Sequence, residues 1–140
     1  MRAMKGYNLI VVYSENLKQV LMCIRKNPPY KGLSNFVGGK IESGEDGLQA
    51  AYRELQEETS ITKDDIVLTH FMDFTYYSFG LYREVYVGKL NKTVAVNGEE
   101  NALYWSSLDE DFFDTSRYAG EGNIGHILKE IDGSKEKVLL

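Results

Sequence analysis

Three glutamates between residues 46 and 59 have the spacing to bind one ligand together. Glu57 and Glu58 follow Glu54 by three and four residues, so on a helix of about 3.6 residues per turn they lie on one side. Like charges at this spacing destabilise a helix by about 0.2–0.5 kcal/mol per pair, and no lysine lies between them. They also lie toward the C-terminal end of the predicted helix, where its dipole disfavours anions. The arrangement therefore predicts that a cation binds here.

The ligand type indicates which cation this is. Carboxylate oxygens without cysteine or histidine nearby favour a hard ion, so we expect Mg²⁺, with Mn²⁺ as the alternative and zinc disfavoured. Protein-bound Mg²⁺ keeps several waters and completes its coordination with substrate phosphate. Just before the helix, Gly38 and Gly39 allow a ligand to approach the backbone, and Lys40 supplies an ammonium for phosphate. The stretch therefore predicts chemistry on a phosphoanhydride.

One helix has to hold the three glutamates. The apolar residues on its other side recur with helical spacing and predict its buried face: Leu48, Ala51, Tyr52 and Leu55. Ser43 and Asp46 have the spacing of a capping box that begins the helix. We expect the helix to cover about 46–59, directly after the two glycines.

This stretch resembles the signature of the Nudix hydrolases. The signature reads Gly, five residues, Glu, seven residues, Arg-Glu, an aliphatic residue, any residue, Glu-Glu, any residue, Gly and an aliphatic residue. Here it begins at Gly39, continues with Glu45 and ends with 53–61 (RELQEETSI). Ser60 stands in place of the last glycine, and we expect this difference to affect the end of the helix and not the chemistry.

The resemblance implies roles for the matching residues. Glu57 and Glu58 correspond to the principal metal ligands, and Glu54 to the residue that serves as ligand, general base or both. The Gly39 carbonyl is expected to add a backbone ligand. Arg53 is expected to orient the glutamates, which makes it the fourth member of the catalytic set.

Residues outside the signature are also candidates for the site. Glu100, five residues before Trp105, lies where related oxidised-purine hydrolases have an acidic residue beside the metals, so it is a metal ligand or base, or else an exposed loop residue. Lys40 and Arg25 are expected to face phosphate, and a strand-end charge is the alternative for Arg25. Asn35 corresponds to an asparagine that hydrogen-bonds the base in those hydrolases.

Further side chains have two interpretations each. Glu45 either pairs with Arg53 and the start of the helix or takes part in catalysis. Asn123 either caps the last helix, which we favour, or contacts the nucleotide. Four aromatic residues either stack on a base or belong to the core: Tyr30, Phe36, Phe74 and Tyr118.

The rest of the chain predicts a mixed sheet. Runs rich in β-branched and aromatic residues predict strands at 7–13, 19–25, 35–37, 66–77, 81–90 and 102–105. We expect a short helix at 108–112 and, from apolar residues at helical spacing, a last helix at 124–131. Strands with intervening helices imply an α/β fold with one domain over 1–140. The resemblance implies the same fold, an α/β/α sandwich with a mixed β-sheet.

The composition narrows the class of protein. A net charge of −5 argues against binding to nucleic-acid polymers, which requires a basic face. Cys23 is the one cysteine, which excludes an internal disulfide and fits a reducing compartment. No apolar run has the length of a membrane span, and the first residues lack the apolar core of a signal peptide. We expect a cytoplasmic monomer or homodimer whose partner is a small nucleotide.

Three functions remain open from the sequence. The first is Mg²⁺-dependent hydrolysis of a nucleoside triphosphate, such as an oxidised purine deoxynucleotide, to the monophosphate and pyrophosphate; Asn35 and Lys40 favour it. The second is hydrolysis of another nucleoside diphosphate derivative, such as ADP-ribose, a nucleotide sugar or a dinucleoside polyphosphate, for which Tyr77 resembles a marker. The third is a module that senses nucleotides without turnover, which the three intact glutamates disfavour.

Overall fold

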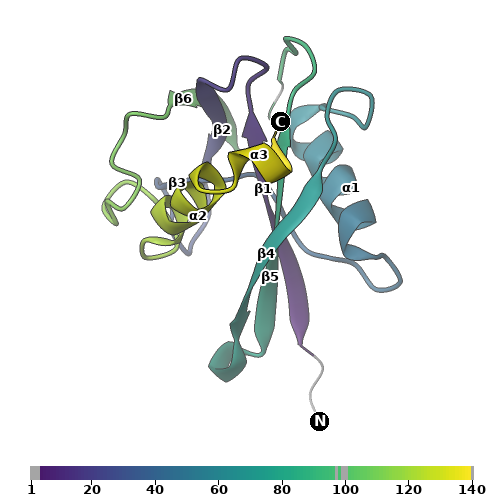
Figure 1. The fold of residues 1–140 in the computed structure, drawn as a ribbon. Helices are drawn as coiled ribbons and strands as arrows, with labels where there is room; N and C mark the ends of the chain where they lie inside the picture. The colour runs from purple at the N-terminus through teal and green to yellow at the C-terminus, as the bar shows by residue number, and fades with distance from the viewer. Residues whose placement is uncertain (1–3, 97, 99–100, 140) are drawn as a thin grey trace.

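The computed structural model of the chain describes residues 4–96, 98 and 101–139 (Figure 1). The predicted ligand Glu100 lies outside these described residues, so its role stays a prediction. None of the helices in the described part of the chain has the length and apolar character to cross a membrane.

The strands form one mixed sheet. They are β1 (Lys5–Tyr13), β2 (Gln19–Ile24), β3 (Ser34–Asn35), β4 (Thr69–Tyr76), β5 (Leu81–Lys89) and β6 (Ala102–Ser107). Their order is β3-β2-β1-β5-β4, and β6 also pairs with β2. Strands β1 and β5 are parallel, whereas the other paired strands are antiparallel. This arrangement confirms the predicted mixed sheet.

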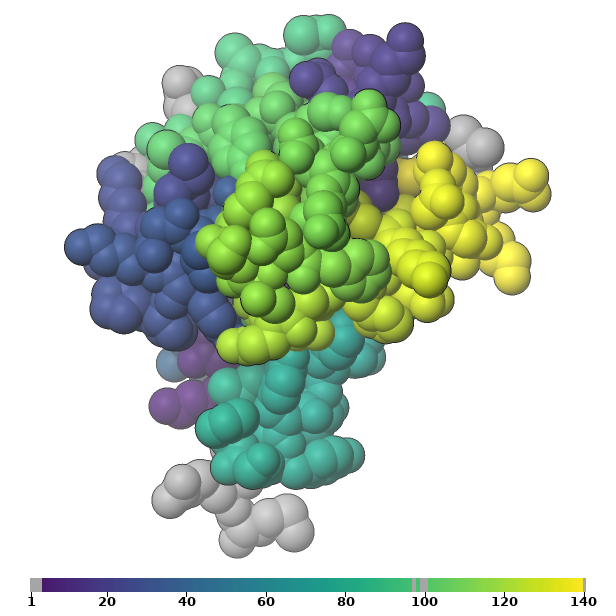
Figure 2. Space-filling view, turned by 90° about the vertical axis from the view of Figure 1, so that its left-hand side faces the viewer, coloured from purple at the N-terminus to yellow at the C-terminus, as the bar shows by residue number. Residues whose placement is uncertain are grey.

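Helices cover both faces of this sheet. They are α1 (Gly47–Thr59), α2 (Asn123–Asp132) and the short α3 (Lys135–Val138), and a 3₁₀ turn, η1 (Tyr77–Phe79), joins β4 to β5. Figure 1 shows α1 and α2 on opposite sides of the sheet, which confirms the predicted α/β sandwich. The end of the β4–β5 hairpin projects from the body of the molecule, as the teal segment in Figure 2 shows.

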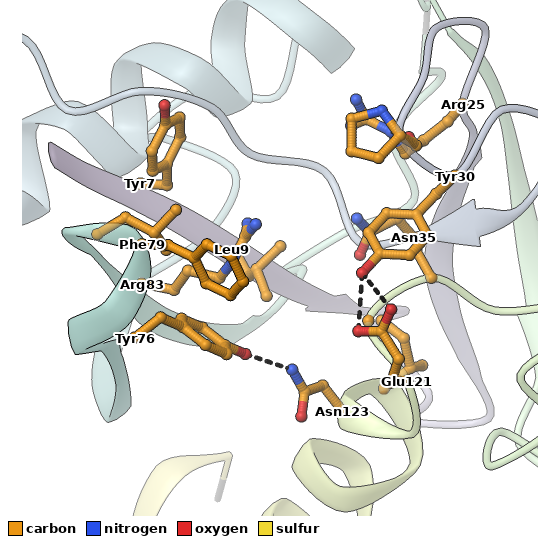
Figure 3. Close-up of a pocket in the computed structure, with 15 residues that line it drawn as sticks. Tyr7, Leu9, Arg25, Tyr30, Asn35, Tyr76, Phe79, Arg83, Glu121 and Asn123 are labelled. Atoms are coloured by element: carbon orange, nitrogen blue, oxygen red, sulfur yellow. Dashed lines mark hydrogen bonds between the residues drawn. The ribbon is translucent and has the colours of Figure 1, made fainter.

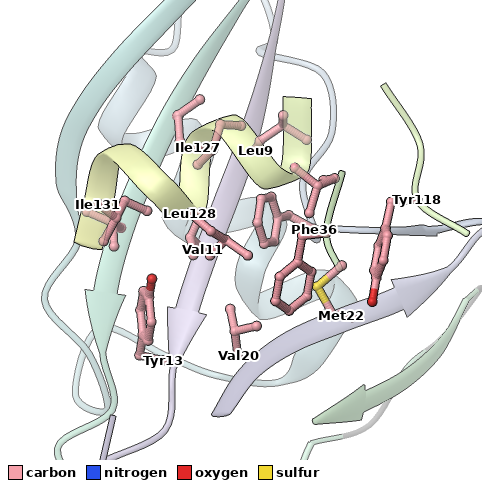
Figure 4. Close-up of a cluster of buried hydrophobic side chains, with 14 of the residues drawn as sticks. Leu9, Val11, Tyr13, Val20, Met22, Phe36, Tyr118, Ile127, Leu128 and Ile131 are labelled. Carbon is pink, nitrogen blue, oxygen red and sulfur yellow. The ribbon is translucent and has the colours of Figure 1, made fainter. Parts of the chain in front are cut away.

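Strand β1 contributes side chains to both cores. Leu9 and Val11 pack against α2 on one face (Figure 4). Ile10 and Val12 pack against Leu55 of α1 on the other face. This alternation is the period of two that a strand imposes on its side chains, and it requires β1 to be apolar on both faces.

The start of α1 differs from the prediction. The N-cap is Asp46, not Ser43. The Asp46 carboxylate accepts the Gln49 N–H at 2.8 Å, and the Gln49 side chain accepts the Asp46 N–H at 3.2 Å. This is a capping box one turn later than expected. Gly44 has a left-handed φ of 86°, so a helix cannot run through it from Ser43.

The buried face of α1 also differs in part. Leu48, predicted to be buried, is 43% exposed. Ala51 and Leu55 are fully buried as predicted, and Ala50 is buried in place of Leu48. The buried residues Ala50, Ala51, Leu55 and Thr59 also recur at helical spacing, so the buried face is rotated relative to the predicted one.

The predicted helix at 108–112 is wrong, because this segment forms turns. Two side chains bond to the backbone there: the Ser107 hydroxyl accepts the Asp109 N–H, and the Asp111 carboxylate accepts the Phe113 N–H. Such local bonds compete with the helical pattern. Strand β4 is also shorter than predicted, because Ile66 makes only an isolated bridge.

The thiol of Cys23 is predicted to be unreactive in the folded protein. Burial raises its pKa to about 11, with the charge of Glu58 adding to the effect and that of Arg25 opposing it. The folded state therefore favours the neutral thiol. This contribution to stability is present below the unfolded pKa and is lost as the pH rises through about 11.

At pH 8 we expect iodoacetamide to alkylate the native protein about 100-fold more slowly than the urea-unfolded chain, because the thiolate is the nucleophile. Mass spectrometry measures this directly, since the sequence contains one cysteine. Equal rates in the two states would contradict the burial of this side chain.

Candidate active site

The C-terminal end of α1 is fixed by local hydrogen bonds. Ser60 adopts a left-handed φ of 70°, and its N–H donates to the Gln56 carbonyl at 2.9 Å. The Thr59 hydroxyl donates to the Leu55 carbonyl and accepts the N–H of Ile61. Ser60 thus takes the backbone conformation for which glycine is usual, as expected from its place in the signature.

Arg53 joins the start of the helix to two of the glutamates. It binds Glu45 through two nitrogens, with Nε and Nη2 at 2.8 and 2.7 Å from the carboxylate oxygens. Its Nη1 donates to Glu54 at 3.0 Å and to Glu57 at 3.2 Å. Its Nη2 also donates to the Lys40 carbonyl at 2.9 Å. One guanidinium therefore sets the positions of both glutamates, and the predicted Glu45–Arg53 pair is present.

Glu45 has the electrostatics of a structural carboxylate. The hydrogen bonds from Arg53 lower its pKa to about 2, and the Glu42 N–H adds to this effect. A group with so low a pKa is a poor proton acceptor near neutral pH. Of the two interpretations of Glu45, the pair that anchors Arg53 is the one that the geometry favours.

Glu54 lies in a different environment. Its side chain is 13% exposed and lies against Gly39, where an added Cβ would overlap the carboxylate. Burial raises the pKa of this carboxyl, and the charge of Glu57 adds to the rise, whereas Arg53 opposes it. A raised pKa brings a carboxylate closer to the range of a general base.

The Gly38–Gly39 segment is held against β1. The Asn8 N–H donates to the Gly39 carbonyl at 2.8 Å, and the Gly39 N–H donates to Oδ1 of Asn8 at 2.9 Å. Gly38 has a φ of 150°, and a Cβ there would overlap the Asn8 carbonyl. Both glycines are therefore required by space, one against the strand and one against Glu54.

These parts meet in a cavity of about 380 Å³, which we call the glutamate cavity. The residues that line it are Arg25, Asn27, Gly38, Gly39, Glu54, Glu57, Glu58, Asn101 and Leu103. The structure thus brings the three predicted glutamates together with Gly39 and Arg25. Oxygen ligands and a cation that line one cavity can hold a metal ion and a phosphate side by side.

The other predicted phosphate ligand is placed differently. The Lys40 side chain is exposed and lines neither the glutamate cavity nor the neighbouring cavity described below. Arg25 lines both cavities, and its Nε donates to the Pro29 carbonyl at 3.0 Å. Contact of either residue with phosphate stays a prediction.

A second cavity, of about 600 Å³, shares the side chain of Arg25 with the glutamate cavity; we call it the aromatic cavity (Figure 3). Its lining includes Tyr7, Leu9, Tyr30, Asn35, Tyr76, Phe79, Arg83, Glu121 and Asn123. The Tyr30 hydroxyl lies 2.7 Å from both carboxylate oxygens of Glu121. The Asn123 amide donates to the Tyr76 hydroxyl at 2.7 Å. Flat rings and polar groups in one cavity suit a planar heterocycle.

The prediction that Asn123 caps the last helix is wrong, and the four aromatic candidates divide between the cavity and the core. Asn123 does not cap α2, because the N-cap is Gly122 and makes no side-chain cap bond. The Asn123 side chain reaches into the cavity instead. Of the aromatic candidates, Tyr30 lines the cavity, whereas Phe36 and Tyr118 are 2% exposed and belong to the core, with Phe74 packed against it.

Several residues of the aromatic cavity were not predicted. Tyr76 and Arg83 come from the β4–β5 hairpin, and Glu121 comes from the turn before α2, which is far from that hairpin in the sequence. The one local signal was a charged residue between two glycines, since Glu121 is flanked by left-handed Gly120 and Gly122. Such a turn exposes a side chain at the start of a helix.

Another group of possible metal ligands lies elsewhere among the described residues. Ligand atoms of His70, Asp73 and Glu84 lie within 4.8 Å of one another. His70 Nε2 pairs with Asp73 at 2.6 Å, and Glu84 accepts the Tyr86 hydroxyl at 2.8 Å. The Glu84 carboxylate also lies against Gly47 at the start of α1, where the helix dipole favours an anion. These contacts account for the group without a cation.

Comparisons with known proteins give a family and a fold. A family model described as NUDIX domain matches residues 5–119. A dihydroneopterin triphosphate diphosphatase of Escherichia coli (strain K12) is 43% identical over 53 residues, which cover 38% of this chain and 34% of that protein. The matched segment thus spans about a third of this relative's length.

Solved structures with the same fold cover almost the whole chain. One is a bifunctional NMN adenylyltransferase/ADP ribose pyrophosphatase from Francisella tularensis, with a TM-score of 0.74 and 19% identity over 95% of this chain and 42% of that one. Another is an Ap4A hydrolase from C. elegans, with a TM-score of 0.72 and 22% identity over 94% of this chain and 99% of that one. Similarity at this level of identity is similarity of fold.

Proposed function

Since the chain belongs to the NUDIX domain family, we propose that it is a metal-dependent pyrophosphohydrolase that cleaves a phosphoanhydride bond of a nucleotide. The observation that supports this most directly is the glutamate cavity, which Glu54, Glu57 and Glu58 line together with Gly39 and Arg25. The aromatic cavity beside it has the volume and the flat side chains for the base.

The residues present fit a hard divalent ion. The donor set consists of carboxylate and carbonyl oxygens, which suits Mg²⁺ or Mn²⁺. Glu54, Glu57 and Glu58 would hold the ion, with the Gly39 carbonyl as a further ligand. That carbonyl accepts one hydrogen bond from Asn8 and retains a second lone pair.

The chemistry follows from charge and position. When bound, Mg²⁺ lowers the pKa of a water ligand and neutralises charge on phosphate oxygens. Glu54 accepts the proton of the attacking water, for which its semi-buried carboxylate is suited. Arg53 holds Glu54 and Glu57 in place through its paired hydrogen bonds, and Arg25 offsets phosphate charge between the two cavities. Positioning and electrostatics of this kind are what phosphoanhydride hydrolysis requires.

We infer that the substrate is a nucleoside triphosphate, and that the products are the monophosphate and pyrophosphate. Asn35, which lines the aromatic cavity, is the proposed base contact; its Oδ1 accepts the Phe36 N–H, which fixes the side chain at the cavity wall. Tyr77, the residue that resembles a marker of dinucleoside polyphosphate hydrolases, is 83% exposed and lines neither cavity. This placement favours the triphosphate over the dinucleoside substrate.

A panel of substrates tests the proposal. We expect release of pyrophosphate from at least one nucleoside triphosphate, its loss in EDTA, and its recovery with Mg²⁺ or Mn²⁺, all measured by chromatography of the nucleotide products. The panel includes oxidised purine triphosphates, ADP-ribose, a nucleotide sugar and a dinucleoside polyphosphate. Turnover of only the last three overturns the triphosphate assignment. Tight binding of nucleotides without any turnover shows a sensing module instead.

A further inference from the structure

We propose that Asn8 is a positioning residue, which acts through the Gly39 backbone to set the place of the Glu54 carboxylate. The expected effect on the reaction rate rests on the proposed function, whereas the contact between Asn8 and Gly39 does not. Asn8 lies in β1, outside the signature, so the sequence motif does not predict a role for it.

Asn8 is an unusual residue for its position. It lies in β1 within the run 7–13 (YNLIVVY) and is 1% exposed. The Nδ2 atom of Asn8 is buried, and it has no hydrogen-bond partner among the described residues. An amide with an unpaired donor is costly inside a protein, and an apolar side chain would be less so. Packing alone therefore does not explain an asparagine here.

Two hydrogen bonds join Asn8 to Gly39. Its backbone N–H donates to the Gly39 carbonyl, and its Oδ1 accepts the Gly39 N–H. Both polar groups of the Gly39 backbone are thus held by Asn8. Two residues away on either side, the Ile10 N–H donates to the Val37 carbonyl and the Ile41 N–H donates to the Gly6 carbonyl, so the backbone of this segment is bonded to β1 on both sides of Gly39.

Gly39 in turn lies against the reacting group. There is no room for a Cβ between Gly39 and the Glu54 carboxylate, so a shift of this backbone moves the space that the carboxylate occupies. The Gly39 carbonyl, a proposed metal ligand, is moved by the same shift. Misplacement by about 1 Å can lower a rate by about 100-fold.

The nucleotide side of the site is separated from this contact. Tyr7 and Leu9, the neighbours of Asn8 in β1, line the aromatic cavity (Figure 3). Alternation along a strand directs the Asn8 side chain to the opposite face, beside Gly39. A change at Asn8 is therefore expected to alter the rate and the metal requirement and to leave nucleotide affinity almost unchanged.

The test uses Asn8→Leu, which has similar size and lacks the acceptor, with Val12→Ala as the matched control. Val12 is buried on the same face of β1, four residues beyond Asn8, and both backbone groups of Gly39 are bonded to Asn8. For Asn8→Leu we expect kcat to fall by about 10–100-fold, the Mg²⁺ concentration for half-activation to rise, and KM for the nucleotide and Tm to change little. For Val12→Ala we expect the reverse, a lower Tm with kcat retained.

Hydrogen exchange of the Gly39 amide, measured by NMR without substrate, tests the contact independently of turnover. We expect faster exchange in Asn8→Leu and wild-type protection in Asn8→Asp, which keeps an acceptor oxygen. Unchanged exchange in Asn8→Leu overturns the inference even if the chain is an active hydrolase. A parallel loss of kcat, KM and Tm in both Asn8→Leu and Val12→Ala also overturns it. If the chain has no activity, the exchange result still decides whether Asn8 holds Gly39.

Discussion

Replacing both Glu57 and Glu58 with glutamine is expected to abolish Mg²⁺-dependent turnover, with a fall in kcat of at least about 10³-fold. The two glutamines keep the shape of the helix face and remove the charges that would hold the ion in the glutamate cavity. The measurement is the initial rate at saturating nucleotide over a titration of Mg²⁺, with calorimetry of Mg²⁺ uptake by the same variant.

Folding should survive this double change. Like charges near the C-terminal end of a helix destabilise it, and relief of this repulsion offsets the loss of the exposed Arg53–Glu57 pair, so Tm is expected to change little. Glu130→Gln, an exposed position on α2, controls for the loss of acidic charge and should keep wild-type kcat. Mg²⁺-dependent activity above a tenth of wild type in the double variant would rule out the proposed ligand set.

The variant Gly39→Ala is expected to lower kcat by about 100-fold while the protein stays folded. The added Cβ overlaps the Glu54 carboxylate, which is the end of a flexible side chain and can move away. The backbone of Gly39 is not left-handed, so alanine causes no conformational strain there. The expected result is therefore a displaced base in an otherwise intact protein, measured by kcat together with Tm.

Alanine substitutions at two other glycines serve as controls, one expected to be neutral and one expected to be destabilising. At Gly133, at the end of α2, a Cβ meets nothing closer than 3.7 Å and φ is −71°, so Gly133→Ala should resemble wild type. At Gly38 the Cβ overlaps the backbone carbonyl of Asn8, which cannot move away, so Gly38→Ala should lose stability as well as activity. Wild-type kcat in Gly39→Ala would show that the position of Glu54 does not limit the rate.

The parts that the sequence predicted well are those set by local spacing. The glutamates of α1 follow from helical periodicity, which places Glu54, Glu57 and Glu58 on one side whatever the rest of the chain does. Arg53 reaches Glu57 one turn away for the same reason. The mixed sheet followed from apolar runs long enough to fill both faces of β1.

The errors have physical causes of two kinds. Leu48 fits the helical spacing, but so does Ala50, which belongs to an overlapping face of the helix and is buried in its place. At 108–112, side chains of Ser107 and Asp111 occupy backbone donors that a helix would need. Helical spacing alone determines neither which of two overlapping helix faces is buried nor whether side chains compete for the backbone donors.

The aromatic cavity could not be predicted for a third reason. Tyr7, Tyr30, Tyr76 and Glu121 belong to four segments that only the folded sheet brings together. Asn123 illustrates this, since its bond to Tyr76 joins residues 47 positions apart and draws the amide away from the helix cap. Residues that recognise a ligand from several segments leave no periodic pattern in a sequence.

The two faces of strand β1 serve different parts of the site: Tyr7 and Leu9 line the aromatic cavity, whereas Asn8 bonds to Gly39. Substitutions on the face of Tyr7 and Leu9 can therefore accumulate during evolution without changing the residues that position Glu54. A gene duplicated from this one could therefore acquire a new substrate by a few exchanges in one wall, while inheriting its chemistry intact. Arg25, which borders both cavities, is the position where such drift would be constrained.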